Sequence, residues 1–268
     1  MRTIRRRDVH PTTHHAARSN TIGDRLPDAA RLGNPSFVWR SGQERRLAII
    51  ERYVSLEGRR VLDLGCGVGE YVRAFARQGA QAYGCDIERP RLAQARARGA
   101  PGVMLAAGER LPVRDGALDV VVLNEVIEHV QDDLETMREV SRVLAPGGVA
   151  VIYAPNRLYP FETHGVYLGK RYIFGNIPFV NWLPKSLRNR LAPHARVYSA
   201  GEIERVAVQR GLRMVHHSYV YPGFDNVAAR VPLLARLLRW SCYRAEDSAL
   251  QRFGLSHLLV LHREEGTA

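Results

Sequence analysis

Two carboxylates and an imidazole, Glu125, Glu128 and His129, directly follow an apolar run that ends at Asn124. The spacing i, i+3 and i+4 predicts that the three side chains share one face of a helical turn. Ligand sites of open α/β sheets lie at the carboxyl ends of strands, so we expect this turn to face a ligand. Such a set can take a proton from a hydroxyl, or hold a divalent cation. Carboxylate oxygens would favour Mg²⁺ or Mn²⁺.

A second acid–base pair, Glu162 and His164, follows the next long apolar run. We expect these two side chains to face an acceptor and to assist in moving its proton. The alternative is that they only hold their own loop through hydrogen bonds.

A glycine-rich loop, residues 65–69, follows the short apolar run 61–64. Its glycines let a ligand approach the backbone, and a helix expected from Glu70 points free N–H groups at the same place. A dinucleotide fingerprint requires Gly-x-Gly-x-x-Gly and seats a pyrophosphate there. Glu70 occupies the last of those positions, and its carboxylate would repel a pyrophosphate. The loop therefore favours a ligand with a cationic amino group and no phosphate, and disfavours a nicotinamide-dependent oxidoreductase.

Three further motifs follow in order. The strand expected over residues 81–86 ends in Asp86, whose carboxylate can accept both ribose hydroxyls of a nucleoside. The turn 105–112 precedes the run 118–124, and the turn 144–148 precedes the run 149–153. Together with the glycine loop, this series resembles the motifs of class I S-adenosylmethionine (SAM) dependent methyltransferases, of the methyltransferase type 11 group. The resemblance implies a doubly wound α/β fold whose mostly parallel sheet has seven strands.

The resemblance also implies which residues contact SAM. They lie in the glycine loop and at the ends of the next strands: Asp63, Gly65, Cys66, Gly67, Gly69, Asp86, Ile87, Ala107, Gly108, Glu109 and Asn124. Many relatives carry an aspartate where this chain has Ala107, and that aspartate holds the adenine amino group. Here only the backbone of Ala107 and Gly108, or the side chain of Glu109, is left for this contact.

The Glu-x-x-Glu-His turn is similar to that of the ubiquinone-pathway O-methyltransferases. It is also similar to that of enzymes which modify the 3′-terminal 2′-hydroxyl of small RNAs. In the second group a further histidine completes a metal set, and His194 fits that place. The resemblance thus implies Glu125, Glu128, His129 and His194 as ligands of Mg²⁺ or Mn²⁺. The alternatives are a metal-free His129 acting as general base, or a Glu–His pair that only packs the turn.

Periodicity and composition divide the chain into four segments. We expect a disordered basic tail (1–35), a SAM-binding core (36–156), a substrate or lid insertion (157–198) and the C-terminal part of the same sheet (199–268). The insertion is marked by its prolines, glycines and aromatic residues. Apolar runs predict strands over 60–64, 81–86, 103–106, 118–123, 149–154, 212–221 and 256–261. The 3.6-residue period predicts helices over 42–57, 70–79, 89–99 and 131–144, and from residues 199 and 232.

The formal net charge of +12 over 268 residues raises the question of whether the protein binds nucleic acid. Residues 157–213 hold ten basic and three acidic residues, outside the cofactor motifs. The stretches 169–183 and 232–244 interleave apolar and basic residues, which suits a membrane surface and a lipid-like acceptor, or RNA. Since no RNA-binding module is appended, we expect O-methylation of a small or lipid-like hydroxyl acceptor. An RNA methyltransferase and a non-catalytic SAM-binding protein are the alternatives. No apolar run is long enough to span a membrane, so we expect a cytoplasmic protein that at most touches a membrane.

Overall fold

Seven strands form one sheet in the computed structural model, which describes residues 39–265. They are β1 (Arg60–Leu64), β2 (Gln81–Asp86), β3 (Val103–Leu105), β4 (Leu118–Asn124), β5 (Leu144–Pro155), β10 (Leu212–Val220) and β11 (Ser256–Arg263). Their order is β10-β11-β5-β4-β1-β2-β3, and β11 runs antiparallel to both of its neighbours. All other neighbours pair in parallel. The predicted doubly wound, mostly parallel sheet is confirmed; the tail predicted over 1–35 lies outside the described residues.

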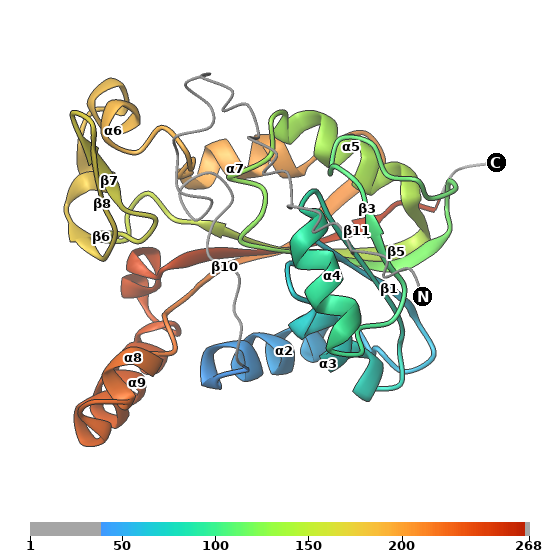
Figure 1. Ribbon diagram of the computed structural model, residues 1–268, viewed down its shortest axis with the longest axis horizontal. Helices are drawn as coiled ribbons and strands as arrows, with labels where there is room; N and C mark the ends of the chain where they lie inside the picture. Colours follow the sequence, from blue (N-terminus) through green and yellow to red (C-terminus); the bar gives the residue numbers. More distant parts are fainter. Residues whose placement is uncertain (1–38, 266–268) are drawn as a thin grey trace, which may run out of the picture.

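Helices cover both faces of this sheet (Figure 1). One face carries α2 (Ser41–Tyr53), α3 (Glu70–Arg77) and α4 (Arg89–Ala97), and the other carries α5 (Asp133–Val143) and α7 (Ala200–Ala207). Side chains of a strand alternate between faces, so Val120 and Val122 of β4 pack with the first group. Val121 and Leu123 of the same strand pack with the second group. A strand buried on both faces explains why its sequence is a continuous apolar run.

Two element boundaries differ by more than two residues from the sequence prediction. The strand expected from residue 149 begins five residues earlier in β5, because Leu144 pairs with Leu118 ahead of an irregularity in register. The helix expected over 42–57 ends at Tyr53, and Val54 is already extended. The predicted cap of α7 is present, since Ser199 and Glu202 form a reciprocal capping box.

Residues 157–198 form a small unit beyond one end of the sheet (Figure 1). It contains two short antiparallel strand pairs: β6 (Phe161–Glu162) pairs with β9 (Ile177–Pro178), and β7 (Val166–Leu168) pairs with β8 (Arg171–Ile173). The turn η2 (Val180–Trp182) and the helix α6 (Lys185–Leu191) follow. Between β10 and β11 the chain adds α8 (Asp225–Ala228), α9 (Pro232–Ala245) and η3 (Ala249–Phe253). None of the helices in residues 39–265 has the length and apolar character needed to cross a membrane.

The winding of the chain creates the crevice in which a ligand can bind. From β1 the chain moves outward to β2 and β3, and then returns to the other side of β1 to form β4. The loops after β1 and β4 therefore diverge at the carboxyl edge of the sheet, which is where open α/β sheets bind their ligands.

Candidate active site

A cavity of about 590 Å³ lies over the carboxyl ends of β1, β2 and β4. This volume is within the range of ligand pockets in proteins. Ten of the eleven residues expected to contact SAM line it: Asp63, Gly65, Cys66, Gly67, Asp86, Ile87, Ala107, Gly108, Glu109 and Asn124. The cavity is also lined by His129, Thr163, His164 and Phe174, so cofactor and catalytic candidates face one space.

The glycine loop owes its shape to backbone angles that glycine adopts without strain. Gly65, Gly67 and Gly69 have φ values of 76°, 53° and 78°. A Cβ atom on Gly65 would lie 2.4 Å from the side chain of Val126, so this glycine lets the loops after β1 and β4 meet. Gly69 does not line the cavity; a Cβ atom there would lie 2.6 Å from Ala100. Gly69 therefore allows close packing of the loop against Ala100 rather than contact with a ligand.

Two buried carboxylates flank the glycine loop. Asp86 accepts the N–H of Gly67 at 2.9 Å on one oxygen and the N–H of Glu88 at 2.8 Å on the other. These bonds fix the orientation of its carboxylate at the end of β2. Asp63 at the end of β1 is buried as well, and burial together with nearby Asp86 raises its pKa well above the usual value. A cationic group in the cavity would favour the charged form of Asp63.

Arg46 of α2 is a cavity residue that sequence reasoning missed. Its guanidinium donates to the Asn124 side chain and, at 2.7 Å, to Oε1 of Glu125, and it lies over the ring of Tyr153. The neighbouring Arg45 instead pairs with Glu246 and does not line the cavity. The helical period offers a signal for this choice, because Arg46 stands one turn before the buried Ile50 and Arg45 does not.

Glu125 does not share a face with Glu128 and His129, which corrects the prediction from spacing. Its φ is 57°, a left-handed conformation in which the i, i+3, i+4 rule of a helix does not apply. Its side chain turns toward Arg46 and Ser256. Burial acts to raise the pKa of Glu125, but Arg46 and Ser256 outweigh burial and hold the pKa below its usual value.

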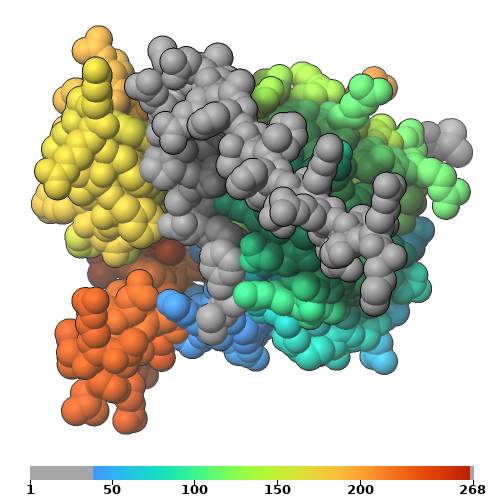
Figure 2. Space-filling view, viewed as in Figure 1, coloured from blue at the N-terminus to red at the C-terminus, as the bar shows by residue number. Residues whose placement is uncertain are grey.

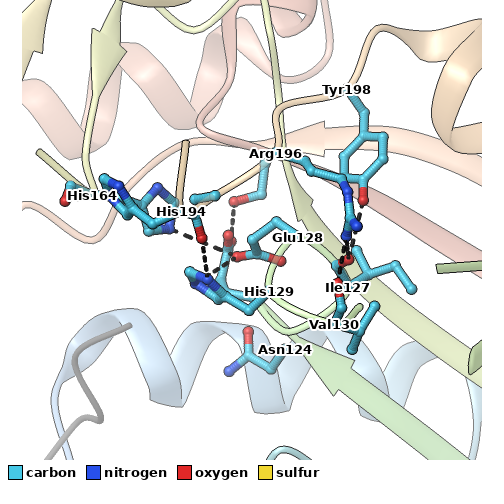
Figure 3. Close-up of polar contacts among 12 residues, drawn as sticks. Asn124, Ile127, Glu128, His129, Val130, His164, His194, Arg196 and Tyr198 are labelled. Carbon is cyan, nitrogen blue, oxygen red and sulfur yellow. Dashed lines mark hydrogen bonds and ion pairs between the residues drawn. The ribbon is translucent and has the colours of Figure 1, made fainter. Parts of the chain in front are cut away.

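Glu128, His129 and His164 form a compact cluster, shown in Figure 3. Their ligand atoms lie within 4.8 Å of one another. Oε1 of Glu128 is 3.8 Å from Nε2 of His129 and 3.8 Å from Nε2 of His164, too far for a hydrogen bond. Both carboxylate oxygens are buried, and neither has a hydrogen-bond partner among residues 39–265. Burial raises the pKa of Glu128 to about 7.

The ring of His129 is oriented by the backbone of His194. Nδ1 of His129 lies 3.2 Å from the carbonyl oxygen of His194, and a carbonyl can only accept, so Nδ1 carries the proton. Nε2 is left with a free lone pair on the side of Glu128. Burial and the neighbouring His164 lower the pKa of His129 to about 4, so the ring is neutral at pH 7.

His164 is held by two further charged groups of the insertion. Its Nδ1 lies 3.0 Å from Oε1 of Glu162, whose other oxygen accepts from Arg188 at 2.6 Å. Burial acts to lower the pKa of His164, but Glu128 and Glu162 outweigh it and raise the pKa to about 10. Glu162 does not line the cavity, so this expected catalytic residue orients His164 rather than facing an acceptor.

The imidazole of His194 lies outside the cluster. Its Nε2 is 3.1 Å from the carbonyl oxygen of His164, and its ring packs edge-on against Tyr167 and Tyr172. The expected metal set is therefore not gathered in the structure. Glu125 and His194 point elsewhere, and His164 takes a place beside Glu128 and His129.

The turn that carries Glu128 and His129 is fastened by the segment after α6. Arg196 donates its backbone N–H to the carbonyl of Glu128 at 3.1 Å and its guanidinium to the carbonyl of Val130 at 2.7 Å. The hydroxyl of Tyr198 donates to the carbonyl of Ile127 at 3.1 Å. These bonds satisfy backbone acceptors of an irregular turn and position the cluster from outside (Figure 3).

Comparisons with known proteins match this chain to methyltransferases. A family model described as a methyltransferase domain matches residues 62–152. An uncharacterized methyltransferase of Mycobacteroides abscessus is 34% identical over 217 residues, which cover 78% of this chain and 78% of that relative. A ubiquinone biosynthesis O-methyltransferase of Sodalis glossinidius is 36% identical over 136 residues, or 48% of this chain. The match spans 54% of that relative, about half of its length.

Solved structures show the same fold. An S-adenosylmethionine dependent methyltransferase from Mesorhizobium loti superposes with a TM-score of 0.55 and 22% identity, over 81% of this chain and 96% of that one.

Proposed function

Because the chain belongs to the SAM-dependent methyltransferases, we propose that it transfers the methyl group of SAM to a hydroxyl of a small or lipid-like acceptor. One observation carries this proposal: His129 and His164 line the same cavity as the glycine loop and Asp86. The similarity to a ubiquinone biosynthesis O-methyltransferase supports the choice of a hydroxyl acceptor.

The cavity offers a partner for each part of SAM. Asp86 would accept the ribose hydroxyls, and the backbone of the glycine loop would meet the methionine end. The carboxylate of Asp63 suits the ammonium group of that end, and the guanidinium of Arg46 suits its carboxylate. Ile87 is 53% exposed although it is apolar, so it offers a surface on which adenine can pack.

The sulfonium methyl is already activated, so the protein must align the acceptor and take its proton. Transfer forms the C–O bond, breaks the C–S bond and releases S-adenosylhomocysteine. We assign the hydroxyl proton to Nε2 of His129, which is unprotonated and faces the cavity. The neighbouring carboxylate of Glu128 would stabilise the imidazolium that forms.

The cluster also fits a divalent cation. Glu128, His129 and His164 would hold the ion, because their ligand atoms lie within 4.8 Å of one another and the two 3.8 Å separations are too long for hydrogen bonds. The unpartnered carboxylate oxygens of Glu128 would find a partner in such an ion. Two imidazoles and one carboxylate favour a metal such as Zn²⁺, Mn²⁺ or Fe²⁺ over Mg²⁺. The lone pair of His129 Nε2 cannot both hold a cation and take the proton, so the two roles are alternatives. When bound, the cation would lower the pKa of the acceptor hydroxyl in place of the base.

Labelled SAM tests the proposed function. Transfer is measured to phenols, catechols, prenylated phenols and total RNA, each with the whole protein. We expect label in a phenolic or catecholic acceptor, and a loss of at least about a hundredfold in His129→Gln. His216→Gln, in a histidine of β10 that does not line the cavity, is the matched control and should retain activity. Label found only in RNA or on an amine would refute the proposal.

A further inference from the structure

Helix α9 turns an apolar face to solvent. Leu233, Leu237 and Trp240 are 74%, 59% and 60% exposed, and Leu234 is 44% exposed. Their spacing of i, i+4 and i+7 places Leu233, Leu237 and Trp240 in one stripe along the helix. Apolar residues exposed singly are normal on proteins, but a continuous stripe of them marks an interaction surface.

The opposite face of α9 is firmly attached, so this exposure does not come from a loose helix. Arg239 donates to the carbonyl of Gly223 at 2.7 Å and to Asp225 at 3.1 Å. The ring of Tyr243 lies under the guanidinium of Arg45, 3.9 Å from it. Figure 1 shows α8 and α9 projecting together from the end of the sheet. The helix thus presents the stripe on a fixed support.

The charged residues of α9 itself have one sign, and Glu246 and Asp247 follow its end. Residues 230–245 contain four arginines and no aspartate or glutamate. Arg230, Arg236 and Arg244 are exposed, and the guanidinium of Arg244 lies 5.3 Å from the ring centroid of Trp240. A second copy of this face would bring arginines against arginines, which disfavours self-association. A surface with an apolar interior and anionic groups at its boundary would complement both the apolar stripe and the arginines of α9.

We propose that α9 docks the protein onto an anionic phospholipid bilayer. The stripe of Leu233, Leu234, Leu237 and Trp240 enters the boundary between headgroups and acyl chains, while Arg236 and Arg244 pair with lipid phosphates. Docking of this kind is independent of which acceptor the enzyme methylates. The insertion, which contributes the 60% exposed Phe174 to the cavity lining, lies at the same end of the molecule as α9 (Figure 2).

Vesicle sedimentation tests the docking. The whole protein is mixed with vesicles of phosphatidylcholine alone, or of phosphatidylcholine with phosphatidylglycerol. We expect sedimentation with the anionic vesicles only, weakened by salt. Arg236→Glu should lower the partition coefficient at least about fivefold. Leu237→Glu should also lower it strongly, because a charge would enter the apolar boundary.

Leu134→Glu is the matched control, since it adds the same charge at an exposed leucine of α5, away from α9. It should sediment like the unaltered protein, and SAM binding should be unchanged in all three variants. Equal sedimentation of Leu237→Glu and Leu134→Glu would overturn the proposal. So would a dimer in light scattering that Leu237→Glu dissociates, without vesicle binding by the unaltered protein. Neither result bears on methyl transfer, which is assayed with a water-soluble phenol.

Discussion

Nδ1 of His129 lies 3.2 Å from the backbone carbonyl of His194, so the two histidines meet through one ring and one peptide group. This contact gives the two residues different roles. His129 keeps a free Nε2 toward the cluster, whereas His194 contributes an oxygen that any residue would supply.

His194→Ala should therefore be mild and His129→Gln severe. We expect His129→Gln to lower kcat at least about a hundredfold, the usual contribution of a general base. His194→Ala removes the bond from Nε2 to the carbonyl of His164, worth ~1 kcal/mol of stability, and the ring contacts with Tyr167 and Tyr172, worth ~0.5–1.5 kcal/mol each. Because the imidazole takes no part in the cluster, kcat should fall less than about tenfold. Steady-state kinetics and thermal unfolding measure the two effects. Equal losses of kcat would mean that the imidazole of His194 takes part in the chemistry.

Asp86→Ala should weaken SAM binding by ~1.5–3 kcal/mol, because a charge-assisted acceptor of the ribose hydroxyls is lost. Calorimetry measures this as a rise in Kd of about ten- to a hundredfold. Asp86→Asn keeps one oxygen that can accept the N–H of Gly67, so its Kd for SAM should lie between those of the unaltered protein and Asp86→Ala. Asp115→Asn removes an exposed carboxylate and should leave Kd unchanged. An unchanged Kd in Asp86→Ala would refute the assignment of the cofactor pocket.

SAM affinity should rise with pH through the titration of Asp63. Burial and Asp86 raise the pKa of Asp63 in the free protein, so its carboxyl group keeps its proton to a higher pH than an ordinary aspartate does. The ammonium group of SAM interacts with the charged form, so binding strengthens as the proton is lost and then levels off. Calorimetry at a series of pH values measures the slope. Asp63→Asn should bind more weakly and lose this slope, and a slope that survives in the variant would assign it to another group.

The fold was accessible from sequence because its signals are local. Buried parallel strands are continuous apolar runs, and the left-handed residues of the loop after β1 are glycines. The apolar run therefore predicts the strand, and the glycines predict where it ends. The strand, loop and helix around Gly65 and Gly67, and the strand that ends at Asp86, therefore lie where the sequence predicts them. The two small sheets of the insertion did not, because strands of two or three residues carry no readable period.

The sequence predicted the residues of the Glu128, His129 and His164 cluster but not their arrangement, because the arrangement depends on tertiary structure. The spacing of Glu125, Glu128 and His129 predicts one helical face, yet a left-handed Glu125 breaks that face, and glutamate carries no local signal for this conformation. His164 reaches Glu128 because a buried contact of Glu162 with Arg188 fixes its loop. Such a contact joins residues of different elements and leaves no trace in the spacing.

Raising the pH from about 6.5 to about 10 should destabilise the protein through His164. Contacts with Glu128 and Glu162 raise the pKa of His164 to about 10 in the folded state, against about 6.5 in an unfolded chain. A group with a raised folded pKa contributes its full stability below the unfolded pKa and loses it as pH rises through the folded pKa. Chemical denaturation at several pH values measures this. His164→Gln should flatten the decline, while His216→Gln should retain it.

Metal content separates the observed cluster from the set expected by spacing. We expect the protein, dialysed against Zn²⁺ or Mn²⁺ and then against buffer, to retain about one ion, because two imidazoles and a carboxylate are suitable ligands. Glu128→Gln should lose the ion, since Glu128 supplies the only carboxylate of the cluster. Glu125→Gln should keep it, because Glu125 is turned to Arg46 and Ser256. Elemental analysis of both variants, with SAM binding as a check of folding, decides the matter. Loss of the ion in Glu125→Gln as well as in Glu128→Gln would favour the set predicted from the motif, which contains both residues. Full activity without any bound ion would leave His129 as a metal-free base.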